Sequence, residues 1–261
     1  MSIPRPQQSD PLALLAATAG VITTAAMIAT PLVPKGGAAR RALSSVVVGG
    51  LAATTKANAT RRWGARRAGL AAVAVGATTA VVERTGTRTG LPFGRYQYTG
   101  VLRPEIGGVP AIVPLAWFAM AVPAREAAHA ALGARSSGPS RVVLGAVALT
   151  AWDLFLDPQM VGEGYWAWAR NGAYRGIPAT NFVGWFVTGL GVMVILERTL
   201  PVGVPSAALV GEYGLMAAME TVGFAKYFHD PLVAVVGGVT MLPVALAALV
   251  GVVRAAGTDR R

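Results

Sequence analysis

Two long apolar stretches, one near each end of the chain, decide its fold. Residues 12–33 read LALLAATAGVITTAAMIATPLV, and residues 231–254 read PLVAVVGGVTMLPVALAALVGVVR. An α-helix rises 1.5 Å per residue, so about twenty apolar residues cross the ~30 Å hydrocarbon core of a bilayer. Both stretches are therefore predicted to be membrane-spanning helices. The first is also too long for the apolar part of a signal peptide.

Six further stretches have the apolar character of spans: 42–59, 68–83, 109–131, 141–157, 179–199 and 206–224. The stretch at 42–59 is the weakest, because Gly49 and Gly50 interrupt it and its end is polar. The sequence therefore predicts an all-α fold, a polytopic transmembrane helix bundle of about seven or eight spans with re-entrant or interfacial loops. We expect a single integral-membrane domain over residues 1–261, with several passes through the cell membrane.

The composition excludes several other classes of protein. Of the 261 residues, 54% are hydrophobic and only 13% are charged, about half the charged fraction of ordinary soluble domains. This balance excludes a water-soluble enzyme and a disordered chain. Most Lys and Arg residues behind the net charge of +11 lie between the apolar stretches, which indicates membrane topology and contact with the bilayer, not nucleic-acid binding.

Residue usage also limits the chemistry. The chain has no cysteine, which excludes disulfides, iron–sulfur clusters and thiol catalysis, and its two histidines are too few for a multi-His metal centre. Carboxylate-bound Mg²⁺ is the remaining metal with a plausible ligand set. We expect no metal and no cofactor.

The aromatic residues gather in two segments of the chain. Of the 19 Phe, Trp and Tyr residues, five lie in 92–118 and nine in 152–186. The loop segments 84–108 and 158–178 are separated by two spans, so they are expected on the same face of the membrane. An interfacial aromatic belt is one explanation, but a belt would also mark the N-terminal spans. A lined cavity explains the clustering better.

Asp153 and Asp157 are the most informative carboxylates. Four residues apart, they project from one helical face, and Pro158 is expected to end that helix directly afterwards. Two carboxyl groups in a dry site cannot both ionise cheaply, so we expect one proton to be retained, as in a general acid beside a general base. A helix end in water is the alternative. The D-x-x-x-D spacing also permits a Mg²⁺–diphosphate site, as in membrane prenyltransferases.

Three other ionisable residues near the predicted span ends allow structural and functional interpretations. Glu83 and Glu197 are each followed by arginine, so a local ion pair at the interface is possible for both. For Glu197 we expect that pair, whereas for Glu83 a functional role is equally well supported. His129 is expected at a solvated interface.

The motif-bearing segments resemble a known family. They read TGLPFGRYQY at 89–98, GVP at 108–110, PLAW at 114–117, AWDLFLDPQM at 151–160, GYW at 164–166, GIP at 176–178 and NFVGW at 181–185. This ordered series resembles the membrane-integral carotenoid biosynthesis family, whose characterised members are carotenoid hydratases. The resemblance covers about 83–197, which we take as the catalytic core. It implies that water adds across the terminal double bond of an acyclic carotenoid end. The substrate could be a monocyclic carotene, a lycopene-type chain or a prenylated precursor of bacterioruberin-like pigments.

The chemistry of that reaction selects candidate residues. Protonating a trisubstituted alkene needs a carboxylic acid kept neutral in an apolar pocket, and the tertiary carbocation needs aromatic faces. The acid–base candidates are Asp153, Asp157 and Glu83, with Asp153 expected as the proton donor. The substrate-binding candidates are Phe93, Tyr96, Trp117, Trp152, Tyr165, Trp166, Gln159, Asn181 and Trp185. Of these, Gln159 and Asn181 are expected to orient the water.

Two other functions remain open at this point. A prenyltransferase would show a second Asp-rich motif, and an ion-coupled transporter of a lipophilic substrate would often show inverted repeats; neither is visible in the sequence. For the hydratase, the expected partners are a carotenoid substrate, the lipid bilayer and other membrane enzymes of the same pathway.

Overall fold

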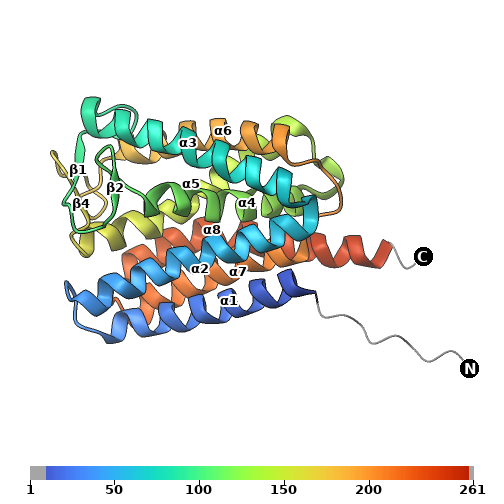
Figure 1. Ribbon diagram of the computed structural model, residues 1–261, viewed down its shortest axis with the longest axis horizontal. Coiled ribbons are helices and arrows are strands. Elements are labelled where there is room, and N and C mark those ends of the chain that lie inside the picture. The colour runs from blue at the N-terminus through green and yellow to red at the C-terminus, as the bar shows by residue number, and fades with distance from the viewer. Residues whose placement is uncertain (1–9, 259–261) are drawn as a thin grey trace, which may run out of the picture.

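A computed structural model describes residues 10–258, which form one bundle of eight α-helices (Figure 1). The helices are α1 (Pro11–Ala29), α2 (Ala38–Trp63), α3 (Ala65–Thr89), α4 (Ile112–Leu132), α5 (Gly138–Gly162), α6 (Ala179–Thr199), α7 (Ala207–Lys226) and α8 (Pro231–Thr258). The expected all-α bundle is confirmed, and each predicted span corresponds to one helix. The residues 1–9 and 259–261 of the expected domain lie outside the described part.

The loops carry four short strands that the sequence analysis did not predict. They are β1 (Tyr96–Tyr98), β2 (Glu105–Ile106), β3 (Val109–Pro110) and β4 (Trp166–Trp168). β1 pairs antiparallel with β4, so the segments 84–108 and 158–178 lie together at one end of the bundle, as expected (Figure 1). β2 and β3 form a hairpin whose turn is Gly107–Gly108, both with positive φ. The described chain ends lie at the opposite end of the bundle.

Local sequence explains where the helices begin and end. The Asp10 side chain caps α1 by accepting hydrogen bonds from the backbone of Leu12 and Ala13. Gly64, at φ 83°, separates α2 from α3, and Gly90, also at φ 83°, ends α3 in the left-handed region that glycine adopts most readily.

One expectation about helix continuity is wrong, because α5 continues through Pro158 to Gly162. Proline lacks the N–H that would bond the carbonyl four residues earlier, here that of Leu154. The Tyr174 hydroxyl donates to this Leu154 oxygen at 2.8 Å, so the freed carbonyl keeps a partner. Helix α2 is continuous through Gly49 and Gly50, but it is not among the described helices that are long and apolar enough to cross a membrane, in agreement with its weak apolar character in the sequence.

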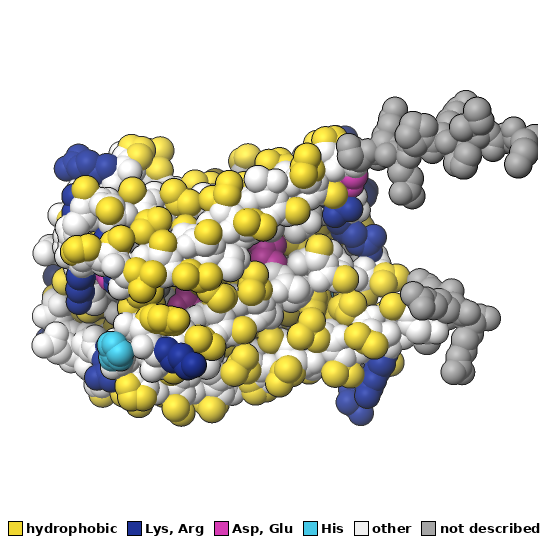
Figure 2. Space-filling model, turned by 90° about the horizontal axis from the view of Figure 1, so that it is seen from below, with side chains coloured by type: hydrophobic (Ala, Val, Ile, Leu, Met, Phe, Trp, Pro, Cys, Tyr) yellow, Lys and Arg dark blue, Asp and Glu magenta, His cyan; other side chains and the backbone are white. Residues whose placement is uncertain are grey.

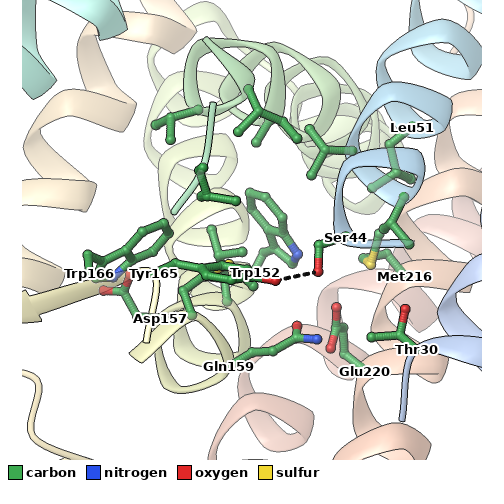
Figure 3. Close-up of a pocket in the computed structure, with 18 of the residues that line it drawn as sticks. Thr30, Ser44, Leu51, Trp152, Asp157, Gln159, Tyr165, Trp166, Met216 and Glu220 are labelled. Atoms are coloured by element: carbon green, nitrogen blue, oxygen red, sulfur yellow. Dashed lines mark hydrogen bonds between the residues drawn. The ribbon is translucent and has the colours of Figure 1, made fainter. Parts of the chain in front are cut away.

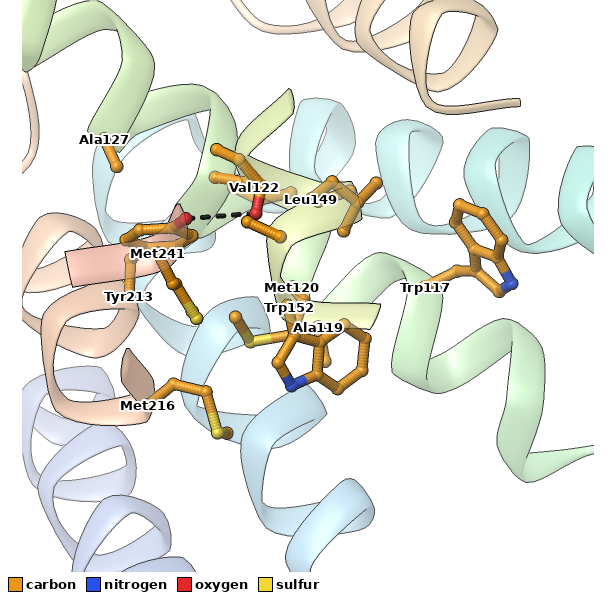
Figure 4. Packing of buried hydrophobic residues seen from close by; sticks show 14 of the residues in the cluster. Trp117, Ala119, Met120, Val122, Ala127, Leu149, Trp152, Tyr213, Met216 and Met241 are labelled. Atoms are coloured by element: carbon orange, nitrogen blue, oxygen red, sulfur yellow. Dashed lines mark hydrogen bonds between the residues drawn. The ribbon is translucent and has the colours of Figure 1, made fainter. Parts of the chain in front are cut away.

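Helix α4 is the centre of the bundle. Its residues from Trp117 to Ala130 are all buried, and α2, α3, α5, α7 and α8 pack around it. Figure 4 shows Met120 and Val122 of α4 among Leu149 of α5 and Tyr213 of α7, whose hydroxyl donates to the Ala148 carbonyl at 3.0 Å. Because α4 is surrounded by protein, it can carry charged residues that a lipid-facing helix could not.

A network of buried charges joins four helices at the end of the bundle away from the strands. The Arg125 guanidinium donates to Glu126 at 2.9 Å and to Glu197 at 2.8 Å, and Arg141 donates to Glu197 at 2.5 Å. The backbone N–H of Ser206 donates to Glu126. Glu197 therefore pairs with arginines of α4 and α5, not with its neighbour Arg198 as expected.

His129 lies in the same region and also differs from expectation. It is 9% exposed, and its buried Nδ1 atom has no hydrogen-bond partner among the described residues. The expectation of a solvated histidine is wrong, because α4 runs through the centre of the bundle instead of along its surface.

The outer surface of the bundle is apolar in its middle. Figure 2 shows hydrophobic side chains over the central part of one face, with Lys and Arg gathered towards the two ends. Large apolar side chains such as Val21, Val73 and Val253 are about 70% exposed. Among the described residues, five helices are long and apolar enough to cross a membrane: α1, α3, α5, α6 and α8. A soluble monomer rarely exposes so much apolar surface, so the surface indicates a membrane protein.

Candidate active site

One cavity of about 360 Å³ brings the predicted site residues together. It lies near the strand end of the bundle and is lined by residues of α1 to α7, β1 and β4. The candidates that line it are Glu83, Phe93, Tyr96, Trp117, Trp152, Asp157, Gln159, Tyr165, Trp166, Asn181 and Trp185. Asp153 does not line the cavity; it is fully buried behind the lining residues.

Asp153 and Asp157 form a compact pair on α5. Asn181 of α6 donates through its one amide nitrogen to Asp153 at 3.0 Å and to Asp157 at shorter range. The two carboxyl groups therefore share one hydrogen-bond donor. Both side chains are at least 98% buried, and the second oxygen of Asp153 has no partner. Two adjacent carboxyl groups that are buried in this way are more stable when they share one proton than when both are ionised.

The two carboxyl groups of the pair have different surroundings. Asp157 lies on the cavity wall beside the Trp166 indole (Figure 3), whereas Asp153 lies one helical turn earlier and contacts protein on all sides. The sequence expectation named Asp153 as the donor. The structure instead places Asp157 where a proton could pass to a bound molecule.

Glu83 has a different environment from the aspartate pair. Its carboxylate accepts hydrogen bonds from the hydroxyls of Tyr96 and Tyr98, the latter at 2.7 Å, and from the Trp117 indole at 3.0 Å. Burial, together with the Glu83 charge, raises the pKa of both phenols above the ordinary tyrosine value, so these hydroxyls remain donors. Glu83 is thus held by three hydrogen-bond donors, which come from β1 and α4. The ion pair with Arg84 is not formed, since Arg84 bonds the Gly107 carbonyl.

Aromatic rings form much of the remaining wall. Trp117 stacks on Trp185 with ring centroids 3.8 Å apart, and Trp152 meets Trp185 edge-on at 6.2 Å. Tyr96 lies 5.7 Å from Trp168 across the paired strands. The electron-rich faces of such rings attract a cation that is held against them.

Two glycines let the loop before β1 close the cavity. A Cβ on Gly184 of α6 would come within 2.7 Å of the Phe93 ring and 2.9 Å of the Pro92 carbonyl oxygen. A Cβ on Gly86 of α3 would lie 3.0 Å from Phe93 and Tyr96. The loop therefore packs between α3 and α6 and caps the bundle, which suits an interfacial loop buried against protein.

Some lining residues were missed by sequence reasoning. Tyr98 and Trp168 belong to the patterns Y-Q-Y and W-A-W, whose alternation places both rings of each strand on one face. This alternation of aromatic residues could have identified Tyr98 and Trp168 from the sequence. Thr30 and Ser44 come from the N-terminal helices, where no motif marked them. Within the described residues, no three His, Asp or Glu side chains are grouped as ligands of a metal ion.

Comparison with known proteins gives the family. Bisanhydrobacterioruberin hydratase of Haloarcula japonica is 31% identical over 118 residues, which cover 44% of this chain and 40% of that protein. No solved structure matches the chain significantly. The model of the family described as carotenoid biosynthesis protein matches residues 41–254. This range contains nearly all of α2, the whole of α3 to α7, and α8 almost to its end. By this match over most of its length, the chain belongs to the carotenoid biosynthesis protein family.

Proposed function

We propose that this protein is a carotenoid hydratase, a hydro-lyase that adds water across the terminal double bond of an acyclic carotenoid end. The observation that carries the proposal is the buried Asp153–Asp157 pair, with Asp157 facing an aromatic cavity. The hydratase from Haloarcula japonica supports it. The reaction needs a protonated acid positioned in a dry site, and a proton retained by this pair would serve as that acid without any redox group.

The first chemical step uses the shared proton of the pair. Asp157 donates it to the CH carbon of the terminal alkene, leaving a tertiary cation on the neighbouring carbon. Asp153 and Asn181 hold Asp157 in place and keep its proton available. The stacked pair of Trp117 and Trp185 stabilises the positive charge as it develops, and Glu83 holds Trp117 in place by accepting a hydrogen bond from its indole.

The substrate reaches the cavity from the lipid. Ile28 of α1 and Val222 and Tyr227 at the end of α7 line the cavity and are each about half exposed, so the cavity meets the apolar surface between these helices. One end of a long polyene can enter here while the rest stays in the bilayer. We therefore place the protein in the cell membrane as a multi-pass protein, with residues 83–197 as its catalytic core.

Cysteine labelling tests this placement, because the chain has no native cysteine. Single cysteines at the exposed positions Ile106 and Arg170, both at the strand end, should react with an impermeant thiol reagent from the same side of the membrane. Ala134, exposed between α4 and α5, should react from the other side. Labelling of Ile106→Cys and Arg170→Cys from opposite sides would contradict the topology.

Pigment analysis tests the function itself. Expression in a host that accumulates acyclic carotenes should convert them into tertiary alcohols that are one water heavier for each hydrated end. Mass spectrometry and chromatography of the extracted pigments measure this. If the wild type leaves every acyclic carotenoid unchanged, the hydratase proposal is wrong.

The prenyltransferase alternative rests on the D-x-x-x-D spacing, and chelation separates it from the hydratase. Among residues 10–258, the cavity lining includes no Lys or Arg that could neutralise a diphosphate. We expect hydration by membranes or detergent-purified protein to continue in EDTA without added nucleotide. Loss of activity in EDTA and recovery with Mg²⁺ would favour prenyl transfer.

A further inference from the structure

Glu220 of α7 is a buried carboxylate that has no hydrogen bond or ion pair to another described residue. It is 9% exposed and lines the cavity, although it lies outside the motif-bearing segment 83–197. The other carboxylates buried within the bundle have partners: Glu83, Glu126, Asp153, Asp157 and Glu212 each accept a hydrogen bond. A buried polar group without a partner is costly, so this position points to a ligand that bonds to it.

A second polar group without a partner lies beside Glu220. Figure 3 shows the Gln159 amide and the Glu220 carboxylate directed towards the same part of the cavity, with Thr30 close by. The Gln159 side chain also has no hydrogen bond to the described residues. The hydroxyls of Ser44 and Tyr165, 3.1 Å apart, add polar atoms at the edge of this region. A buried water needs two to four polar partners, and these groups supply them.

The position of this polar region relative to Asp157 suits an addition reaction. In Figure 3, Asp157 is drawn near Trp166 on one side of the cavity, whereas Glu220 is drawn on the other side, towards Thr30. The two carboxyl groups come from different helices, α5 and α7. A cation formed beside Asp157 can therefore meet a water molecule that is held elsewhere on the wall.

We infer that Glu220 and Gln159 bind the water that adds to the substrate cation, and that Glu220 accepts its proton. This inference rests on the proposed hydratase function. The alkene π electrons take the Asp157 proton to form the C–H bond, and a lone pair of the water forms the C–O bond at the cation. The oxonium then loses its proton to Glu220. That proton returns to Asp157 through water, so one turnover adds one H₂O and consumes nothing else.

Glu220→Gln tests the inference by separating protonation from water capture. Without a base for the water, alcohol formation should fall at least tenfold. Asp157 should still protonate the alkene, and the cation should then lose a proton and return to the alkene. In D₂O, the recovered carotene should therefore gain deuterium at its terminal vinylic CH. Gln159→Met, which removes the amide at similar length, should show the same separation if Glu220→Gln reduces the amount of inserted protein.

Glu212→Gln is the matched control. Glu212 lies two turns earlier on α7, is equally buried, and accepts a hydrogen bond from Thr55, but it does not line the cavity. This variant should hydrate at close to the wild-type rate. Asp157→Asn should give neither alcohol nor deuterium uptake.

Two results would overturn the role of Glu220 while the wild type remains an active hydratase. The first is hydration by Glu220→Gln at nearly the wild-type rate. The second is parallel loss of alcohol formation and deuterium uptake in folded Glu220→Gln, which would assign Glu220 to protonation or to structure. A wild type that forms no alcohol at all would instead contradict the proposed function.

Discussion

Replacing Asp157 with asparagine is expected to stop hydration and to leave a folded, inserted protein that accumulates unhydrated carotenoid. Asparagine has nearly the same shape and still bonds Asn181, but it has no acidic proton for the alkene. General acid–base assistance is worth roughly 10²–10⁴ in rate, and an unactivated alkene calls for the upper part of that range. The measurement is the rate of alcohol formation per amount of inserted protein.

The comparison with Asp153→Asn locates the donor. Asp153 does not line the cavity and meets the lining through Asn181, so this variant should lose less activity than Asp157→Asn. Glu212→Gln again serves as the control for removing a buried charge. If Asp157→Asn hydrates normally and Asp153→Asn is inactive, the donor is Asp153, as the sequence alone suggested.

Removing Arg125 is expected to destabilise the protein more than any substitution at an exposed ion pair. The Arg125 side chain is 1% exposed and bonds Glu126, Glu197 and the Leu200 carbonyl. In Arg125→Met, Glu126 remains buried without a counter-ion. Breaking a buried ion pair in this way lowers the free energy of unfolding by about 3–5 kcal/mol. Thermal unfolding of the purified protein in detergent should show a clearly lower midpoint.

The chain offers a matched control and a rescue for this prediction. The Arg61–Asp10 pair has side chains 40% and 47% exposed, so water screens it and Arg61→Met should barely change the unfolding midpoint. The double variant Arg125→Met with Glu126→Gln removes both buried charges and should recover part of the loss. An Arg125→Met midpoint equal to that of Arg61→Met would show that the network contributes little.

Hydropathy and helix geometry determined most of the fold from the sequence. Each predicted span became a helix, since the length and apolar character of a stretch are local properties that add along the chain. Counting two spans between 84–108 and 158–178 was enough to place these segments at the same end of the bundle. The ends of helices at glycines also followed local rules.

Two local rules gave the wrong result where a distant residue intervened. Pro158 was expected to end α5, but the Tyr174 hydroxyl satisfies the carbonyl that proline leaves free. Glu197 was expected to pair with its neighbour, but helix packing brings Arg125 and Arg141 to it. Neither partner can be identified from the sequence around the residue, because each comes from another element of the fold.

The sequence by itself pointed to many of the residues that line the candidate site, and the tertiary structure decided how they are oriented there and which others join them. Composition and motifs gathered the aromatic residues and the carboxylates Glu83, Asp153 and Asp157. Only the rotation of α5 about its axis shows that Asp157 faces the cavity and Asp153 does not, and only the packing of α7 brings Glu220 to the same cavity. The physical reason is that the hydrophobicity of a helix is the sum of its own residues and can be read from the sequence. The partner of a buried polar group instead depends on the angle at which neighbouring helices pack.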